Sequence, residues 1–220
     1  MTIQETRARA RRERAQAMAR EDILEAALRC FAQSGFAHTK IADIAAAAAD
    51  AAASLYTYYP GKKEIFVAAA EHFVNRIEAA FGPVPEAPAE SFESFASEIR
   101  TRIRSLCAYG DAHSEVLAFF MRLKWTGDAA LADLPMAPST ECVAAHGGHG
   151  AHRLPQHIAE VWQRLGAGAF GVDPIILSGI VIGTIEAFFV RKYLLGAGGT
   201  MSEDADQIAD LLLYGVRGNR

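Results

Sequence analysis

Apolar residues recur at helical spacing along most of the chain, whereas the alternation of apolar and polar residues that predicts a strand is rare. The first clear stripe starts after Glu21, and its apolar side chains return every three or four positions up to Phe31. Ser34-Gly35 is expected to end this helix, because glycine is common just past a helix end. Thr39 can cap a second short helix, and a third centres on Leu55. These periods predict an all-α fold.

The helices predicted further along the chain are longer. One runs from Lys62 to Phe81, and the proline-rich segment from Gly82 to Pro88 follows it as a stiff connector. The most apolar helix begins at Pro174, since proline suits the first helical position. We therefore expect two helical units, residues 21–66 and 88–220, joined by the helix that begins at Lys62.

Composition places the chain among globular proteins with a large core, because 51% of its 220 residues are hydrophobic. The apolar run from Ile175 to Ile185 is too short to span a bilayer, and the N-terminus is too polar for a signal peptide. Three scattered cysteines, Cys30, Cys107 and Cys142, argue against a disulfide framework. These features predict a cytoplasmic protein with no membrane partner.

Charge is distributed unevenly. The net charge is −4, but ten basic and seven acidic side chains lie within residues 1–63, which leaves +3 there and −7 on the remainder. Residues 1–20 are rich in arginine, poor in apolar residues and without a helical stripe, so in isolation we expect a mobile basic arm. Two interpretations stay open for it: a solvated tail, or an arm whose arginines reach DNA phosphates or the minor groove.

The segment from Thr39 to Phe66 has the layout of a helix-turn-helix. Two short helices precede Pro60-Gly61, which breaks the second of them, and Lys62 then opens the long helix. A short helix held between two others is the geometry that enters the major groove of DNA. The segment therefore predicts a DNA-binding domain.

Three segments within residues 22–66 together resemble the tetracycline-repressor (TetR) family of bacterial transcription regulators. They are ILEAALRCFAQSGF, TKIADIAAAA and LYTYYPGKKEIF, and the most specific part is Leu55-Tyr56-x-Tyr58-Tyr59-Pro60-x-Lys62. The resemblance implies a three-helix DNA-binding domain at the N-terminus and a larger helical domain at the C-terminus that binds a ligand and dimerises. It also implies a homodimer.

One stretch departs from the family pattern. Relatives usually show Ala-Gly-Val-Ser-x-Gly-Thr before Leu-Tyr, whereas residues 48–54 here read Ala-Ala-Asp-Ala-Ala-Ala-Ser. Alanine thus replaces the turn glycine, the serine cap and the second glycine, and alanine offers only a methyl contact to a base. Asp50 can instead cap the recognition helix.

The resemblance assigns the contacts with double-stranded DNA to the head of the second helix, the third helix and the head of the fourth. The residues are Thr39, Lys40, Ala52, Ser54, Tyr56, Tyr58 and Lys62. Most of these would contact phosphates, which position the domain while few side chains read the bases. For the tyrosines, packing between helices is the competing interpretation.

The aromatic-rich helices of the second unit are where a helical bundle can leave an apolar cavity for a small molecule. The candidates for a ligand site are Phe95, Ile99, Phe119, Trp125, Trp162 and Phe188. For each of them alone, ordinary core packing is the simpler interpretation. Glu186, inside the most apolar helix, either pairs with Arg191 at an interface or faces a pocket.

Four histidines cluster in or beside the irregular segment 126–156. They are His146, His149, His152 and His157. A zinc or nickel site is one interpretation, but the glycines among them and the lack of cysteine or a fixed carboxylate favour a polar loop. We predict no metal and no cofactor. No nucleophile elbow, phosphate loop or carboxylate pair is present, so no enzymatic activity is expected.

Together these features predict a ligand-responsive DNA-binding transcriptional regulator, in the simplest case a dimeric repressor that a small, largely apolar molecule releases from its operator. Two copies are expected to pair through about 174–196 and 202–216, where Gly179 and Gly183 leave a flat strip for close approach. The alternative is a ligand- or partner-binding protein of the same fold with weakened or lost sequence-specific DNA recognition.

Overall fold

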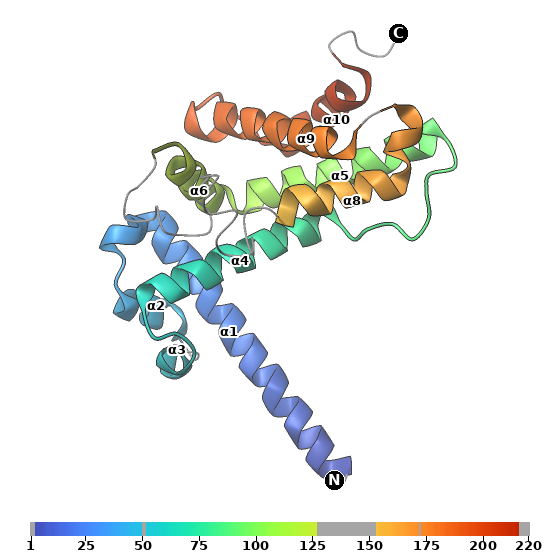
Figure 1. Ribbon diagram of the computed structural model, residues 1–220. Helices are drawn as coiled ribbons and strands as arrows, with labels where there is room; N and C mark the ends of the chain where they lie inside the picture. Colours follow the sequence, from blue (N-terminus) through green and yellow to red (C-terminus); the bar gives the residue numbers. More distant parts are fainter. Residues whose placement is uncertain (1–2, 50–51, 127–152, 172, 216–220) are drawn as a thin grey trace.

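The computed structural model describes residues 3–49, 52–126, 153–171 and 173–215, and these residues are all-helical (Figure 1). Three helices form a small N-terminal unit: α1 (Ile3–His38), α2 (Ile41–Ala47) and α3 (Ala52–Tyr58). The long helix α4 (Lys62–Phe81) begins at this unit and runs into the second one, as its apolar stripe predicted. The predicted fold class is confirmed.

The second unit is a layered helical bundle. Its α-helices are α5 (Phe92–Ala112), α6 (Ser114–Thr126), α8 (Arg153–Leu165), α9 (Pro174–Phe189) and α10 (Ala205–Tyr214). Short 3-10 segments cover Ala167–Phe170 and Ser202–Asp204, and a π-helical turn, Val190–Leu194, prolongs α9. Helix α8 packs along α9, α5 packs along α10, and α4 contacts both α5 and α8 (Figure 1).

Helix α1 begins much earlier than the apolar pattern predicted, at Ile3 instead of Glu21 or Asp22. The residues before Glu21 are mainly alanine, arginine, glutamine and glutamate, which are strong helix formers. An ion pair between Arg9 and Glu13, 2.8 Å apart and one turn from each other, adds to this preference. The missing apolar stripe therefore predicts only that this part of the helix lacks packing. The expected break at Gly35 is confirmed by its φ of +73°.

Two apolar clusters hold the fold together. The first joins α1, α2, α3 and the first half of α4 around Phe31, Ile44, Leu55 and Phe66, and α6 adds Phe119 to it. The second lies between α5, α8, α9 and α10, and its largest fully buried side chain is Trp162. Because α6 packs on α1 and belongs to the second unit, the two units share an apolar contact.

Polar side chains of α5 fix the ends of neighbouring helices. Arg102 is 6% exposed, donates to the carbonyl oxygen of Phe81 at 2.9 Å and pairs with Glu98 at 2.7 Å, so it caps the end of α4. Asp111 accepts hydrogen bonds from the Tyr193 hydroxyl at 2.6 Å and from the Ser202 backbone N–H at 2.9 Å. Burial alone would raise the pKa of Asp111, but these donors outweigh burial and hold its pKa below the usual value.

Candidate functional site

The start of α2 is organised differently from the sequence prediction. Lys40 is the N-cap residue, and the Asp43 carboxylate accepts from its backbone N–H at 3.0 Å. Thr39 is 2% exposed, and its hydroxyl donates to the carbonyl oxygens of Gly35 at 2.7 Å and Cys30 at 3.1 Å. The predicted cap role of Thr39 is therefore wrong. Its hydroxyl faces the end of α1, and its DNA contact stays a prediction.

The turn between α2 and α3 contains a strained alanine. Ala49 has a φ of +48°, the left-handed region that favours glycine, at the position where the sequence comparison expects the turn glycine. The backbone therefore keeps the turn that the motif requires although the residue does not suit it. Asp50 and Ala51, which the sequence places in the same turn, lie outside the described residues.

Several predicted contact residues are exposed on the small unit. Lys40 and Tyr56 face solvent, Tyr56 with 66% of its surface exposed. Tyr58 is half-buried, and the Arg20 guanidinium lies 4.5 Å from the centre of its ring. Tyr58 therefore packs between helices and also reaches the surface of the small unit. Ala52 and Ser54 belong to α3, but their side chains lie outside the described part of the structure.

Lys62, predicted to contact phosphate, is instead bound inside the protein. Its ammonium group donates to the carbonyl oxygens of Phe36 at 2.7 Å, Thr39 at 3.0 Å and Ala37 at 3.1 Å. The same group lies 4.7 Å from the centre of the Phe36 ring. All three ammonium donors therefore have partners within the protein, and the phosphate contact of Lys62 stays a prediction.

The neighbouring Lys63 is the exposed cation at this position, although the family resemblance does not assign it to DNA. Its position in α4, one residue from Lys62, turns it by about 100° away from the carbonyl cluster. Lys40, Tyr56, Tyr58 and Lys63 form the candidate surface for DNA binding, which we call the DNA-contact surface. Two cations and two tyrosines suit phosphate contacts more than base readout.

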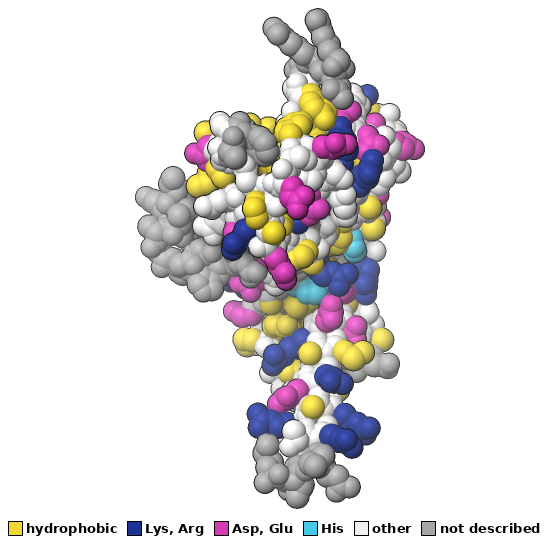
Figure 2. Space-filling model, turned by 90° about the vertical axis from the view of Figure 1, so that its right-hand side faces the viewer, with side chains coloured by type: hydrophobic (Ala, Val, Ile, Leu, Met, Phe, Trp, Pro, Cys, Tyr) yellow, Lys and Arg dark blue, Asp and Glu magenta, His cyan; other side chains and the backbone are white. Residues whose placement is uncertain are grey.

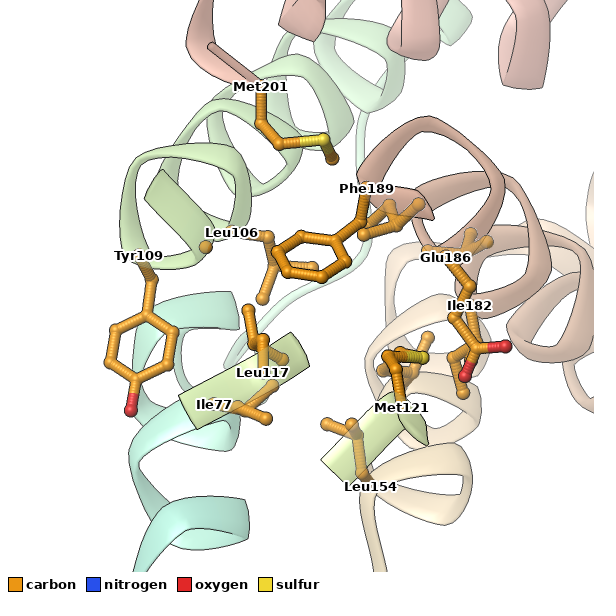
Figure 3. Close-up of a pocket in the computed structure, with 14 residues that line it drawn as sticks. Ile77, Leu106, Tyr109, Leu117, Met121, Leu154, Ile182, Glu186, Phe189 and Met201 are labelled. Atoms are coloured by element: carbon orange, nitrogen blue, oxygen red, sulfur yellow. The ribbon is translucent and has the colours of Figure 1, made fainter. Parts of the chain in front are cut away.

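The second unit contains a cavity of about 110 Å³ between helices (Figure 3). Its walls are almost wholly apolar and come from five helices and the segment before α10. The lining is Ile77, Leu106, Tyr109, Gly110, Leu117, Met121, Leu154, Ile158, Val181, Ile182, Ile185, Glu186, Phe189 and Met201. Glu186 is the acidic residue of this described lining, so of the two alternatives left open for it the structure selects the pocket. Arg191 lies instead 4.0 Å from Asp204.

The ligand residues predicted from sequence do not line this cavity. Phe95, Ile99 and Trp162 are buried in the core of the second unit, and Phe119 is buried in the first cluster. Phe188 packs on the outside of the second core, and the side chain of Trp125 lies outside the described residues. All of the chosen residues except Ile99 are aromatic, whereas the cavity is bordered mainly by aliphatic side chains.

One face of α9 is apolar and exposed. Ile175, Ile176 and Ile180 are 74%, 62% and 50% exposed, and a side chain added at Gly179 or Gly183 would meet nothing within 4 Å. Together with its π-helical turn, α9 covers Pro174–Leu194, a stretch of 21 residues that by length and composition could cross a membrane. Of its most apolar 18 residues, 22% are buried within the protein. The expectation of no membrane span rested on the shorter run from Ile175 to Ile185. An exposed apolar face of this kind is typical of an interaction site.

The histidine cluster contributes one described residue. His157 Nε2 lies 2.9 Å from the carbonyl oxygen of Gly82, so this ring ties α8 to the end of α4. His146, His149 and His152 lie outside the described residues. Within the described part of the chain, no group of three or more metal-ligating side chains could hold an ion.

Comparison with known proteins places this geometry in context. The family model for bacterial regulatory proteins of the tetR family matches residues 23–69, from the buried part of α1 into α4. The fatty acid degradation regulator FadR of Bacillus halodurans has a similar structure, with a TM-score of 0.64 and 16% identity, over 91% of this chain and 97% of that one. A comparison with curated proteins finds no match.

Two further solved structures are similar. FadR of Bacillus subtilis, in complex with stearoyl-CoA, gives a TM-score of 0.58 and 18% identity over 89% of this chain and 98% of that one. A TetR-like transcriptional regulator from Rhodococcus sp. RHA1 gives a TM-score of 0.60 and 21% identity over 92% of this chain and 98% of that one. At these identities the likeness shows a shared fold.

The strained turn generates the first prediction. Ala49→Gly should raise the free energy of unfolding by about 1 kcal/mol, because glycine removes the left-handed strain. Ala46→Gly, an exposed position within α2, is the control and should lower it by a similar amount. Urea unfolding measures both, and a destabilised Ala49→Gly variant would show that the turn is not strained.

The two lysines at the head of α4 should separate stability from DNA binding. Lys62→Met leaves three carbonyl groups without their donor and should lower the free energy of unfolding by about 2 kcal/mol. Lys63→Met should change stability by less than about 0.5 kcal/mol and should weaken DNA binding at low salt. Denaturant unfolding and fluorescence anisotropy with duplex DNA measure the pair; the reverse pattern would contradict the assignment.

Proposed function

We propose a mode of action for this chain, which belongs to the tetR family of bacterial regulatory proteins and is a DNA-binding transcriptional regulator. It is a cytoplasmic repressor that binds its operator as a dimer and leaves it when a small, largely apolar molecule enters the second unit. The observation that carries this proposal is the apolar cavity bordered by α4, the helix whose first residue is bonded to the DNA-binding domain.

Helix α4 is the element that a ligand can move. Ile77 of α4 lines the cavity, and Lys62 at the head of the same helix binds the carbonyl groups that precede α2. A ligand that displaces Ile77 therefore also displaces the start of α2. In a dimer this shift changes the distance between the two recognition helices, which must match half-sites about one DNA turn apart.

A continuous series of aromatic rings supports the same coupling. It begins at Tyr109, which lines the cavity, and ends at Phe36, beneath the Lys62 ammonium group. Neighbouring ring centres are 5.1 to 6.1 Å apart along the order Tyr109, Phe73, Phe120, Phe66 and Phe36. Packed rings of this kind shift together because the interior holds little free space.

The walls of the cavity select an apolar ligand. For scale, an engineered apolar cavity of about 150 Å³ binds benzene, so this cavity accepts a short apolar group as it stands. The stearoyl-CoA complex of the similar Bacillus subtilis regulator makes an acyl chain the first candidate for this chain. A long acyl chain has to part the surrounding helices, and that movement is the displacement of α4 that the proposal requires.

The exposed face of α9 is proposed to pack against the same face of a second copy. Gly179 and Gly183 lie one turn apart on it, so two such helices can approach closely, with the isoleucines on either side. A membrane is a weaker candidate, because the other side of α9 packs along α8. The buried Lys192 ammonium lies 3.0 Å from Asp204, which holds the end of this helical segment within the protein.

Operator binding should depend on this pairing. Ile180→Glu places a carboxylate on the face that becomes buried, so it should raise the dimer dissociation constant by at least about 100-fold and abolish binding to the DNA upstream of the protein's own gene. Analytical ultracentrifugation and gel shift measure the two effects. Thr101→Glu, an exposed site on α5, is the control.

Three outcomes would contradict the proposal. A wild-type chain that remains monomeric, or an Ile180→Glu variant that still dimerises, would show that α9 does not form a dimer interface. A dimer that binds no upstream DNA would favour the alternative, a ligand-binding protein of this fold without specific DNA recognition.

Filling the cavity should uncouple the ligand from DNA. Met121→Trp occupies the space with a larger side chain, so the variant should still bind the operator but should no longer be released by acyl-CoA thioesters of increasing chain length. Met121→Leu keeps the volume and should respond like the wild type. Anisotropy of a labelled operator measures release, and equal release of both variants would place the effector elsewhere.

A further inference from the structure

The N-terminal part of α1 projects from the body as a bare helix (Figure 1). We call this part, residues 3–20, the arm; at about 1.5 Å per residue it is about 27 Å long. Among its described side chains from Thr6 to Met18, all except Ala10 are exposed, and contact with the apolar core begins at Ala19. The arm therefore contributes little to the packing of a single chain.

The arm is strongly basic. Its sequence holds six arginines and two glutamates, and Glu13 is paired with Arg9 at 2.8 Å. Arg7, Arg11 and Arg14 follow one another at spacings of four and three, so they share one face of the helix. Figure 2 shows lysine and arginine side chains gathered on this projection, where acidic side chains are few.

The composition of the arm excludes an apolar partner. Between the arginines stand alanines, and the large apolar side chain in the described arm is Met18. A coiled-coil partner requires a continuous apolar seam, and a membrane-surface helix requires a broad apolar face. A row of cations without such a face complements a polyanion.

The base of the arm is fixed beside the recognition helix. The Arg20 guanidinium lies 4.5 Å from the centre of the Tyr58 ring at the end of α3, and the adjacent Glu21 pairs with Arg76 of α4 at 3.2 Å. The sequence has neither glycine nor proline between Ile3 and Ser34, so no hinge interrupts α1 there. The arm is thus carried at a constant angle to the DNA-contact surface.

We propose that the arm binds the phosphate backbone of the DNA that flanks the operator contacts of α3; this inference rests on the DNA binding of the preceding subsection. Along the helix axis, Arg14 and Arg7 lie about 9 and 20 Å beyond Arg20. These distances equal about three to six base-pair steps of 3.4 Å. The contacts add affinity and salt dependence, and they add no sequence discrimination because phosphates are the same at every step.

The test uses the full chain with Arg7→Gln, Arg11→Gln, Arg12→Gln and Arg14→Gln combined, since glutamine keeps the helix propensity and removes the charge. Affinities for the upstream duplex and for an unrelated duplex are measured over a range of salt concentrations. Loss of three to four phosphate contacts should reduce the slope of log K against log salt by about 3. Both affinities should fall at low salt by a similar factor of at least tenfold, and nuclease protection should shorten by a few base pairs.

The matched control is Arg122→Gln with Arg164→Gln, two exposed cations of the second unit outside the proposed dimer interface, which should leave the slope unchanged. Circular dichroism verifies that the arm variant stays helical. If the wild type binds the duplex and the arm variant keeps its slope, the proposal is wrong while the DNA-binding function stands. If the arm variant loses binding only to anionic lipid vesicles, the partner is a membrane and the proposal is equally wrong. A wild-type protein that binds no duplex overturns both the proposed role of the arm and the DNA-binding function.

Discussion

The ammonium group of Lys62 is the point at which α1, α2 and α4 are held together. It donates to three carbonyl oxygens at the end of α1 and just before α2. These carbonyls follow the break at Gly35, where the regular bonds of a helix end. The start of α2 is therefore bonded to the first residue of α4. Further along α4, Arg76 pairs with Glu21 of α1 at 3.2 Å and His72 Nε2 lies 3.0 Å from Glu25, so polar contacts join these two helices at more than one place.

Helix α9 contributes to both the cavity and the proposed dimer interface. One side packs along α8, a second side lines the cavity through Val181, Ile182 and Phe189, and a third side is exposed and apolar. A helix that is apolar all round is stable only when every side is buried. In the proposed mode of action, the core, a ligand and a second copy bury the three sides. Ligand entry and dimer geometry can therefore influence one another through a single rigid element.

Much of the fold could be predicted from the sequence because helical periodicity and end signals are local. The range Lys62–Phe81 and the start at Pro174 match the structure, since each depends on a stripe of apolar residues and a residue suited to a helix end. The length of α1 could not be predicted from a stripe, because helix propensity alone maintains its exposed arm.

The sites were less predictable because they depend on three-dimensional placement. A resemblance assigns Thr39 and Lys62 to DNA, but the sequence does not show that carbonyl groups lie within reach of both side chains. The cavity could not be predicted for a similar reason. Periodicity identifies which residues are buried, whereas the small volume left unfilled depends on how the helices cross, so aromatic residues such as Phe95 and Trp162 were selected although they fill the core.

The central claim, that one apolar cavity and one DNA-contact surface are energetically coupled, is tested most directly by measuring both affinities under both conditions. Stearoyl-CoA and shorter acyl-CoA thioesters are titrated into the protein with and without a saturating operator duplex, and the duplex is titrated with and without each thioester. Linkage requires that each ligand lowers the affinity for the other by the same factor, and the account predicts a factor of at least about ten. A thioester that binds with equal affinity to the free and the DNA-bound protein would contradict it.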